Sequence, residues 1–285
     1  MKLSPSMTID HDACTGCGSC VRVCPDDTLA VRDGKCEVVG LECLGCDHCA
    51  SICPEGADRM IKPGEFDAAA LVSLMRSRRS CRNYHPKPVP EALLRDLVRI
   101  GQSAPSGTNS QAWRFTILPT RKDVMRLGEP SARFFEDLNR KSESAALRLF
   151  ARFFMDDALG VYHREYHDKV KAALEEFRSG GRERLFHGAP AAILVGSARG
   201  ASCPVEDALL ATQNILLAAH VVGLGTCLVG FVVEALRRDR RVADAIALPP
   251  GERIHAVIAL GYPHEKYVRP AGRRRVDPRV LKLPG

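Results

Sequence analysis

Two runs of four cysteines constrain this chain more than any other feature of its sequence. Each run has the spacing Cys-x2-Cys-x2-Cys-x3-Cys-Pro, and the two runs match each other without a gap. The first extends from Cys14 to Pro25 and the second from Cys43 to Pro54. Three cysteines separated by three residues wrap a short loop around one metal cluster, and the proline after the fourth fixes φ and turns the chain away.

This spacing is the pattern of bacterial ferredoxins, and it predicts two [4Fe–4S] clusters. In that pattern the fourth cysteine of each run binds the other cluster. We therefore expect one cluster to be held by Cys14, Cys17, Cys20 and Cys53. We expect the second cluster to be held by Cys24, Cys43, Cys46 and Cys49.

Disulfide bonds and zinc are the two alternative uses of these cysteines. Structural disulfides are typical of secreted proteins, yet residues 1–20 contain no apolar core of signal-peptide length. Zinc sites usually combine paired Cys-x2-Cys knuckles rather than four cysteines in one run. These observations favour a reducing, cytoplasmic location, and no stretch approaches the roughly 20 apolar residues that a membrane span needs.

The composition of the chain changes after residue 63. Residues 1–63 contain few apolar side chains, so their fold must come largely from the clusters. Ile61–Glu65 contains a Pro-Gly pair that breaks helices, and it is predicted to be a linker. The sequence thus predicts a cluster domain over residues 1–63 and a larger domain over residues 66–285, which is long enough to bury a core.

The two predicted domains carry opposite net charges. Residues 1–63 contain six Lys/Arg and ten Asp/Glu, a net charge of −4, whereas the rest contains 35 and 24, a net charge of +11. Opposite charges favour docking of the domains on each other. The basic residues are scattered along predicted helices, apart from Arg273–Arg275, so nucleic-acid binding is not expected.

Periodicity predicts the elements of both domains. In the larger domain, helices are expected over residues 67–79, 90–103, 120–185, 205–222 and 232–239. Strands are expected there over residues 113–118, 189–197 and 254–260. In the cluster domain, short strands are expected near residues 7–9, 29–32 and 36–39, and a short helical turn is expected to follow the third cysteine of each run.

Three segments of the larger domain have residue types that suit a phosphate-bearing ring. Arg78–Tyr84 offers several guanidinium groups, which can bind a phosphate through paired donors. The loop Ala104–Trp113 contains amide side chains that suit a flat heterocycle. Glu206–Thr226 ends in glycines that permit close backbone approach. Taken singly, each segment is equally compatible with solvated surface, a turn or a helix end, and His220 fits a hydrogen-bonded core or interface histidine better than a catalyst.

Four motifs in order resemble the FMN-dependent nitroreductase family over about residues 70–275. The motifs are R-R-S-C-R-N-Y, A-P-S-G-T-N-S-Q-A-W-R-F, E-D-A-L-L-A-T-Q-N-I-L-L-A-A-H-x-x-G-L-G-T-C, and L-G-Y-P with downstream arginines. With the cysteine runs, the whole chain resembles the ferredoxin–nitroreductase fusion branch. The resemblance implies an α+β fold with a central mixed sheet flanked by helices, preceded by a small ferredoxin-like domain. It also implies an intertwined homodimer with two FMN sites at the subunit interface.

The resemblance also implies, by position, which residues contact FMN. The phosphate and ribityl chain would be contacted by Arg78, Arg79, Ser80 and Arg82. The isoalloxazine edge or the ribityl chain would be contacted from the other subunit by Asn109, with Pro105, Ser106 and Gln111 nearby. The reactive side of the ring would lie near Gly225 and Thr226, and the phosphate would be reached again by Arg273 or Arg274. Cys227 is expected to pack, and Cys81 and Cys203 receive no role.

The fusion of a cluster motif to flavin-type motifs predicts an oxidoreductase. In this hypothesis the clusters pass electrons to FMN, which reduces a small nitro, enone or quinone-like compound without a catalytic side chain. The expected donor is reduced ferredoxin or NAD(P)H. One alternative is an electron-transfer module that relays electrons to a protein partner, and another is a flavin-binding protein without turnover. The sequence names neither the substrate nor the cluster nearest the flavin.

Overall fold

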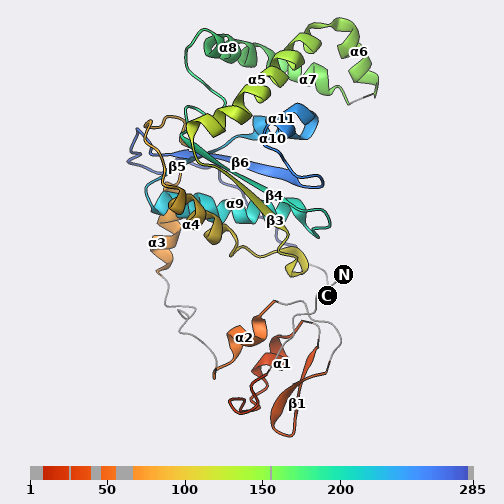
Figure 1. Cartoon of the computed structure of the whole chain (residues 1–285), viewed down its shortest axis with the longest axis vertical. Coiled ribbons are helices and arrows are strands. Elements are labelled where there is room, and N and C mark those ends of the chain that lie inside the picture. The colour runs from red at the N-terminus through yellow and green to blue at the C-terminus, as the bar shows by residue number, and fades with distance from the viewer. Residues whose placement is uncertain (1–8, 26, 40–45, 56–66, 155, 282–285) are drawn as a thin grey trace. The chain divides into compact units, whose positions relative to one another are not determined.

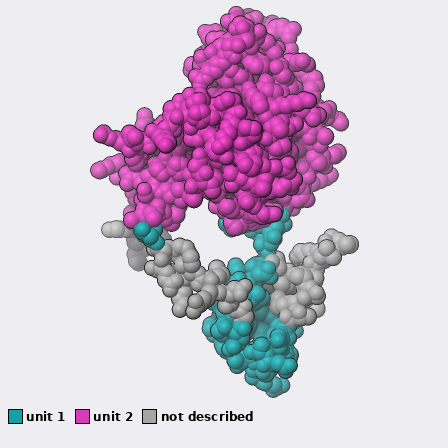
Figure 2. Space-filling model, turned by 60° about the vertical axis from the view of Figure 1, so that its left-hand side comes forward, with its two compact units in different colours: residues 1–68, 105–111 teal, residues 69–104, 112–285 magenta. Residues whose placement is uncertain are grey.

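The structure is a computed structural model, and it describes residues 9–25, 27–39, 46–55, 67–154 and 156–281 (Figure 1). The chain divides into two compact units, each described here by itself (Figure 2). Unit 1 comprises residues 1–68 and 105–111, and unit 2 comprises residues 69–104 and 112–285. The predicted linker lies outside the described residues, so the domain boundary at residues 63–66 and the docking of the two domains stay predictions.

Unit 1 contains a β-hairpin whose turn follows from the sequence. β1 (Leu29–Arg32) and β2 (Lys35–Val38) pair antiparallel, which confirms two of the expected strands. Asp33 and Gly34 join them with φ of 49° and 75°. Asp-Gly is a preferred pair in two-residue hairpins, because both turn positions require positive φ. The strand expected near residues 7–9 lies mostly outside the described residues.

Two short helices in unit 1 show that the repeated sequence produces a repeated backbone. α1 (Ser19–Val23) follows Gly18 with φ 71°, and α2 (His48–Ile52) follows Asp47 with φ 56°. Each helix ends at the fourth cysteine of its run, and that residue is extended, with φ/ψ of −73°/116° in α1 and −68°/119° in α2. Each of these cysteines donates its amide to the carbonyl three residues earlier, at 3.3 Å. The two expected helical turns are present, but each begins one residue before the third cysteine of its run rather than after it.

A four-stranded sheet in the order β3-β4-β6-β5 lies at the centre of unit 2. Its strands are β3 (Trp113–Leu118), β4 (Ala191–Ser197), β5 (Gly225–Leu228) and β6 (Arg253–Gly261). The three strand pairings are antiparallel. Within the described ranges, a single bridge between Ser80 and Thr226 supplies the parallel pairing of the expected mixed sheet. β5 was not expected, because four residues that begin with glycine show no alternation.

Helices cover both faces of this sheet (Figure 1). One face is covered by α4 (Glu91–Gly101) and α9 (Pro204–Val221). The other is covered by α5 (Arg121–Glu143), α10 (Gly230–Arg238) and α11 (Arg240–Asp244). The short α11 has no counterpart among the expected helices. The bounds of α4, α9 and α10 were expected within a few residues, whereas for α5 only the start was.

Strand β4 divides its side chains between the two cores. Ala191, Ile193 and Val195 pack with α4 and α9, whereas Ala192 and Leu194 pack with α5 and α10. This alternation follows from the two-residue period of a strand, and all five side chains are fully buried. A strand covered on both faces explains the continuous apolar run in the sequence.

The segment predicted as helical over residues 120–185 forms four helices. After α5 come α6 (Ala145–Phe154), α7 (Ala158–Glu165) and α8 (His167–Arg178). These three extend beyond the sheet in Figure 1. Two smaller elements remain. They are α3 (Ala68–Ser77), which belongs to unit 2 from Ala69 on, and the 3-10 turn η1 (Gly107–Asn109) of unit 1. No helix in the described ranges is long and apolar enough to cross a membrane.

Candidate functional site

Backbone amides of unit 1 point at cysteine sulfurs. Gly16 N and Cys36 N both donate to Cys14 Sγ at 3.4 Å. Thr28 N donates to Cys24 Sγ at the same distance. Hydrogen bonds to thiolate sulfurs hold the ligands in place and help to set the reduction potential of an iron–sulfur cluster. The backbone around these cysteines therefore fits thiolate-held clusters.

Seven of the eight predicted cluster ligands lie in described parts of the chain, and Cys43 lies outside them. None of the seven forms a disulfide with another described cysteine. In the described residues, no three metal-ligating side chains gather in a way that would hold one metal ion. A [4Fe–4S] cluster does not require this convergence, because each of its four cysteines binds a different iron. The pairing of particular cysteines with each cluster stays a prediction.

Cys36 lies among these ligands although it belongs to neither run. Its side chain is 3% exposed, and its Sγ lies 3.4 Å from Cys20 Sγ. Burial, together with the hydrogen bond and charge of Cys20 and the charge of Cys14, raises the pKa of the Cys36 thiol to about 12. Cys36 therefore packs as a small buried side chain.

Unit 2 contains a cavity of about 400 Å³, which we call the arginine cavity. Four segments line it: the end of α3, the end of α9, the start of β5 and the chain after β6. The predicted FMN residues Arg78, Arg79, Gly225 and Thr226 are part of its wall. The structure thus brings together two of the sequence motifs that are more than a hundred residues apart.

The chain after α3 pairs directly with β5. Cys81 N donates to the Thr226 carbonyl oxygen at 2.8 Å, next to the parallel bridge between Ser80 and Thr226. A Cβ atom on Gly225 would lie 2.7 Å from the Cys81 Cβ and 2.8 Å from its Sγ. A side chain at position 225 would therefore push the two segments apart, which explains why glycine is needed there.

The arginine cavity carries uncompensated positive charge. Burial lowers the pKa of Arg78, and the nearby charges of Arg273 and Arg79 lower it further. None of these three guanidinium groups forms an ion pair with a carboxylate in the described residues. Arg79 lies over the Tyr267 ring, 5.2 Å from its centroid. Several unpaired guanidinium groups at one cavity fit a bound phosphate.

The acidic residue at this cavity does not neutralise the arginines. The Glu265 carboxylate accepts a hydrogen bond from Asn83 Nδ2 at 2.6 Å. His220 is also engaged, because its Nε2 lies 2.9 Å from Ser77 Oγ. Burial lowers the pKa of His220, and the charge of Arg78 lowers it further. His220 is therefore a neutral histidine that ties α9 to the end of α3, in line with its sequence-based interpretation.

Two further arginines that were predicted to contact FMN, Arg273 and Arg82, lie in different surroundings from each other. Arg273 lies close enough to Arg78 to lower its pKa, so the chain after β6 returns to the cavity. Arg82 does not line the cavity and lies beside Cys227, whose pKa is raised by burial and lowered by the Arg82 charge. Cys227 is 3% exposed and belongs to the core beneath the sheet, as expected.

The remaining predicted FMN residues lie in the loop of residues 105–111, which belongs to unit 1. Gln111 N donates to Ser106 Oγ at 3.0 Å, and Gln111 Nε2 donates to Asn109 Oδ1 at 3.1 Å. Thr108, Asn109 and Gln111 have φ between 44° and 49°. Non-glycine residues in this left-handed region are strained and are concentrated at functional sites. Pro105 begins this loop, and its contribution to an FMN site stays a prediction.

The sequence did not assign four wall residues of the arginine cavity to the site: Ser77, Glu265, Lys266 and Tyr267. Lys266 and Tyr267 belong to a tail that looked too irregular to assign. Their signal in the sequence was weak, because an irregular segment has no periodicity from which its neighbours can be inferred.

Comparisons with known proteins match the two parts of the chain to two different families. Residues 75–262 match the model of the nitroreductase family, and residues 6–54 match that of a 4Fe-4S dicluster domain. An NADH dehydrogenase of Thermus thermophilus is 31% identical over 192 residues, which cover 66% of this chain and 84% of the relative. A 4-nitrobenzoate reductase of a Nocardioides species is 26% identical over 214 residues, which cover 68% of this chain and 80% of the relative.

Solved structures share the fold. A nitroreductase with bound FMN from Bacteroides fragilis superposes with a TM-score of 0.52 at 19% identity, covering 75% of this chain and 97% of its own. At this identity the similarity concerns the fold alone. The expected nitroreductase-like α+β fold is confirmed.

Proposed function

The chain belongs to the nitroreductase family, and we propose that it is an oxidoreductase in which two [4Fe–4S] clusters supply electrons through FMN to a small organic substrate. The proposed substrate class is nitro, enone or quinone-like compounds. FMN accepts electrons singly and delivers them in pairs as a hydride, so it suits a position between single-electron clusters and an organic acceptor. The single observation that carries the proposal is the arginine cavity in a chain that also has two complete cluster motifs.

The arginine cavity is proposed to hold the FMN phosphate. Arg78, Arg79 and Arg273 would supply the charge, since no carboxylate of the described residues pairs with them. Gly225 keeps β5 against Cys81, and the adjoining backbone of Thr226 would face the ring. A cluster of unpaired cations repels itself in the empty state, so binding of an anion stabilises the cavity.

The eight cysteines of the two runs are proposed as the cluster ligands. Both runs fall within residues 6–54, which match the dicluster model. The amide donors to Cys14 and Cys24 would hold these sulfurs in the direction of their irons.

A homodimer is proposed because unit 2 leaves large apolar side chains exposed on several elements, among them α9 with its C-terminal end and the tail. On α9 these are Val205, Leu209, Leu210, Val221 and Val222, each at least 46% exposed. On the tail they are Val268, Val276, Val280 and Leu281, each at least 66% exposed. Exposed apolar residues gathered in this way are typical of an interface. In a dimer the loop of residues 105–111 would contribute Asn109 and Gln111 to an FMN site of the partner subunit.

The experiment is anaerobic purification followed by rapid-mixing reduction. Iron, sulfide and FMN would be quantified first, and the protein would then be mixed with dithionite, NADH, NADPH or reduced ferredoxin. The proposal predicts that reduced clusters pass electrons to the flavin, and that a nitroaromatic or quinone acceptor reoxidises it. A protein that carries both cofactors but never transfers electrons between them contradicts the proposal. Transfer to the flavin without reduction of any small acceptor supports the alternative of a relay to a protein partner.

A further inference from the structure

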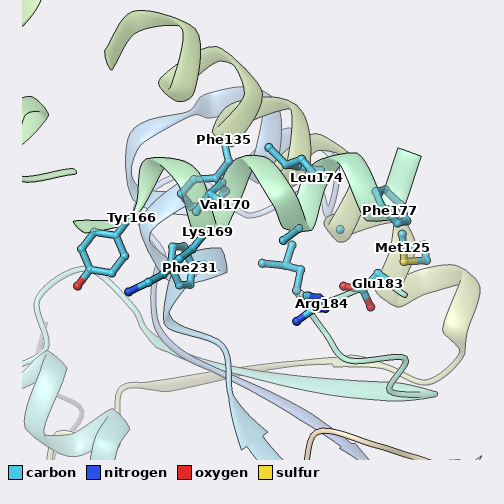
Figure 3. Close-up of a pocket in the computed structure, with 14 residues that line it drawn as sticks. Met125, Phe135, Tyr166, Lys169, Val170, Leu174, Phe177, Glu183, Arg184 and Phe231 are labelled. Carbon is cyan, nitrogen blue, oxygen red and sulfur yellow. The ribbon is translucent and has the colours of Figure 1, made fainter. Parts of the chain in front are cut away.

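A second cavity of unit 2 lies among α5, α8 and α10 (Figure 3). Its volume is about 320 Å³, and it shares no lining residue with the arginine cavity. None of the predicted FMN residues lines it. This volume lies within the range of small-molecule sites in proteins.

The wall of this cavity is almost entirely apolar. Figure 3 shows Phe135 from α5, Phe231 from α10, and Val170, Leu174 and Phe177 from α8 around it. The Phe135 and Phe231 rings meet edge to face, with centroids 5.2 Å apart. Aromatic pairs in this arrangement hold each other in place, so the wall is preformed. An occupant with an apolar body would remove this surface from water.

The cavity also opens toward a second hollow of about 820 Å³. The two hollows have Phe135, Tyr166 and Phe231 in common. These three side chains therefore form the partition between the two hollows.

Three charged side chains reach the cavity, and two of them are neutralised by the protein. Glu183 accepts from Arg121 Nη2 at 3.0 Å, and it also accepts backbone amides of the following turn. Arg184 forms an ion pair with Glu176. The third, Lys169, has no ion-pair partner in the described residues, and the neighbouring Asp168 carboxylate is held by His167.

The position of Lys169 sets the polarity of the site. Figure 3 shows its side chain passing the Phe231 ring on the side of the cavity where Tyr166 lies. Its ammonium is thus placed at the rim of an apolar cavity. An unpaired ammonium next to an apolar wall suits a ligand with one anionic end and an apolar body.

We propose that this cavity binds a monocarboxylate with an apolar chain or ring, with the carboxylate on Lys169 and the apolar body against Phe135 and Phe231. This site is separate from the arginine cavity, so the proposal does not rest on the function proposed above. The ligand is bound and not transformed at this position.

The test is isothermal titration calorimetry of the full-length protein, loaded with its cofactors, with octanoate, octan-1-ol and octylamine. These three ligands share an apolar chain and differ in charge. Octanoate is expected to bind about fivefold more tightly than octan-1-ol, and octylamine more weakly than either. Equal binding of the three ligands, or no binding of octanoate, overturns the proposal.

Matched variants on α8 separate the charge from the apolar wall. Lys169→Gln is expected to reduce octanoate binding to the level of octan-1-ol, and Lys169→Glu is expected to reverse the preference toward octylamine. Lys171→Gln, two residues along the same helix, is the control and should change nothing, because Lys171 does not line the cavity. Octanoate binding that is unaffected by both Lys169 variants contradicts the proposal.

A second pair of variants blocks the cavity itself. Ala173 lines the cavity, whereas its neighbour Ala172 is exposed and does not. Ala173→Phe should abolish binding of octanoate and octan-1-ol alike, and Ala172→Phe should leave both unchanged, with circular dichroism as the check on folding. If Ala173→Phe does not fold, the reversal by Lys169→Glu decides the outcome. Retained binding in a folded Ala173→Phe variant overturns the proposal.

Discussion

Unit 1 and unit 2 are held together by different means. In the described part of unit 1, the nearly inaccessible residues are Thr28, Leu29 and Cys36. Unit 2 has two apolar cores, one on each face of its sheet, with side chains such as Leu194 and Ile193 fully buried. A segment with so little core cannot offset the loss of chain entropy on folding, so its order must come from metal–thiolate bonds. Unit 2 needs no metal to fold.

The largest expected effect is that of cluster removal, which should destabilise unit 1 but not unit 2. Chelation of iron under anaerobic conditions is expected to unfold unit 1 completely and to leave the melting of unit 2 in place. Limited proteolysis and circular dichroism would measure both outcomes. Cys203→Ser is a control outside both runs and should leave cluster absorbance unchanged. Persistence of the hairpin β1–β2 after iron removal would contradict the claim that unit 1 depends on its clusters for order.

The next effect should be confined to unit 2. Leu194→Ala removes a fully buried side chain from the centre of the sheet, and is expected to destabilise unit 2 by about 2–5 kcal/mol. Leu149→Ala is the control, because Leu149 is 56% exposed and its loss should change stability by less than about 0.5 kcal/mol. Denaturant unfolding monitored in the far ultraviolet measures the difference. A parallel loss of cluster absorbance in Leu194→Ala would show that the units are not independent.

A smaller effect concerns the cofactor of unit 2. Arg78→Ala is expected to weaken FMN binding by about tenfold to a hundredfold, since a charge-assisted hydrogen bond contributes about 1.5–3 kcal/mol. Arg76→Ala, in the last turn of α3 two residues before Arg78 but not in the wall of the arginine cavity, should bind FMN as the unchanged protein does. Fluorescence titration of the apoprotein with FMN would compare them. Equal affinities of the two variants would remove the arginine cavity as the phosphate site.

The smallest effect is a pH dependence of unit 2. Burial lowers the pKa of His220, His187 and His255 in the folded state, below the value of about 6.5 expected in the unfolded chain. The stability that these neutral histidines contribute is therefore present above about pH 6.5 and is lost as the pH falls toward their folded pKa values.

A variant isolates the contribution of one histidine. His220→Asn is expected to reduce the number of protons taken up on unfolding between about pH 6.5 and pH 5 by up to about one. Unfolding curves across this pH range give the number directly. His11→Asn, in unit 1, should leave the pH dependence of unit 2 unchanged. An identical slope for His220→Asn would mean that His220 is equally basic in both states.

Much of the fold could be predicted from the sequence because its signals are local. The apolar run of β4 and the alternation of β3 identified two strands, and β3 has the expected bounds. β5 could not be predicted, because Gly225–Leu228 becomes a strand only by pairing with β6.

The site was predictable to different degrees. The motif Arg78–Arg79–Ser80 and the pair Gly225–Thr226 were assigned to one site, and the structure places them in contact. Lys266 and Tyr267 could not be assigned, because a tail without periodicity does not reveal its neighbours.

The sequence by itself determined the two cysteine loops, because metal ligation depends on spacing within about ten residues and on local backbone geometry. The left-handed Gly18 and Asp47 occupy the same place in each repeat, so equal spacing produced equal conformation. Only the tertiary structure decided that Arg273 approaches Arg78 of the arginine cavity with no carboxylate of the described residues paired to either, and that Lys169 lies at the rim of an apolar cavity. Both arrangements join segments that are distant along the chain, and such contacts depend on how helices pack on the sheet rather than on any local pattern.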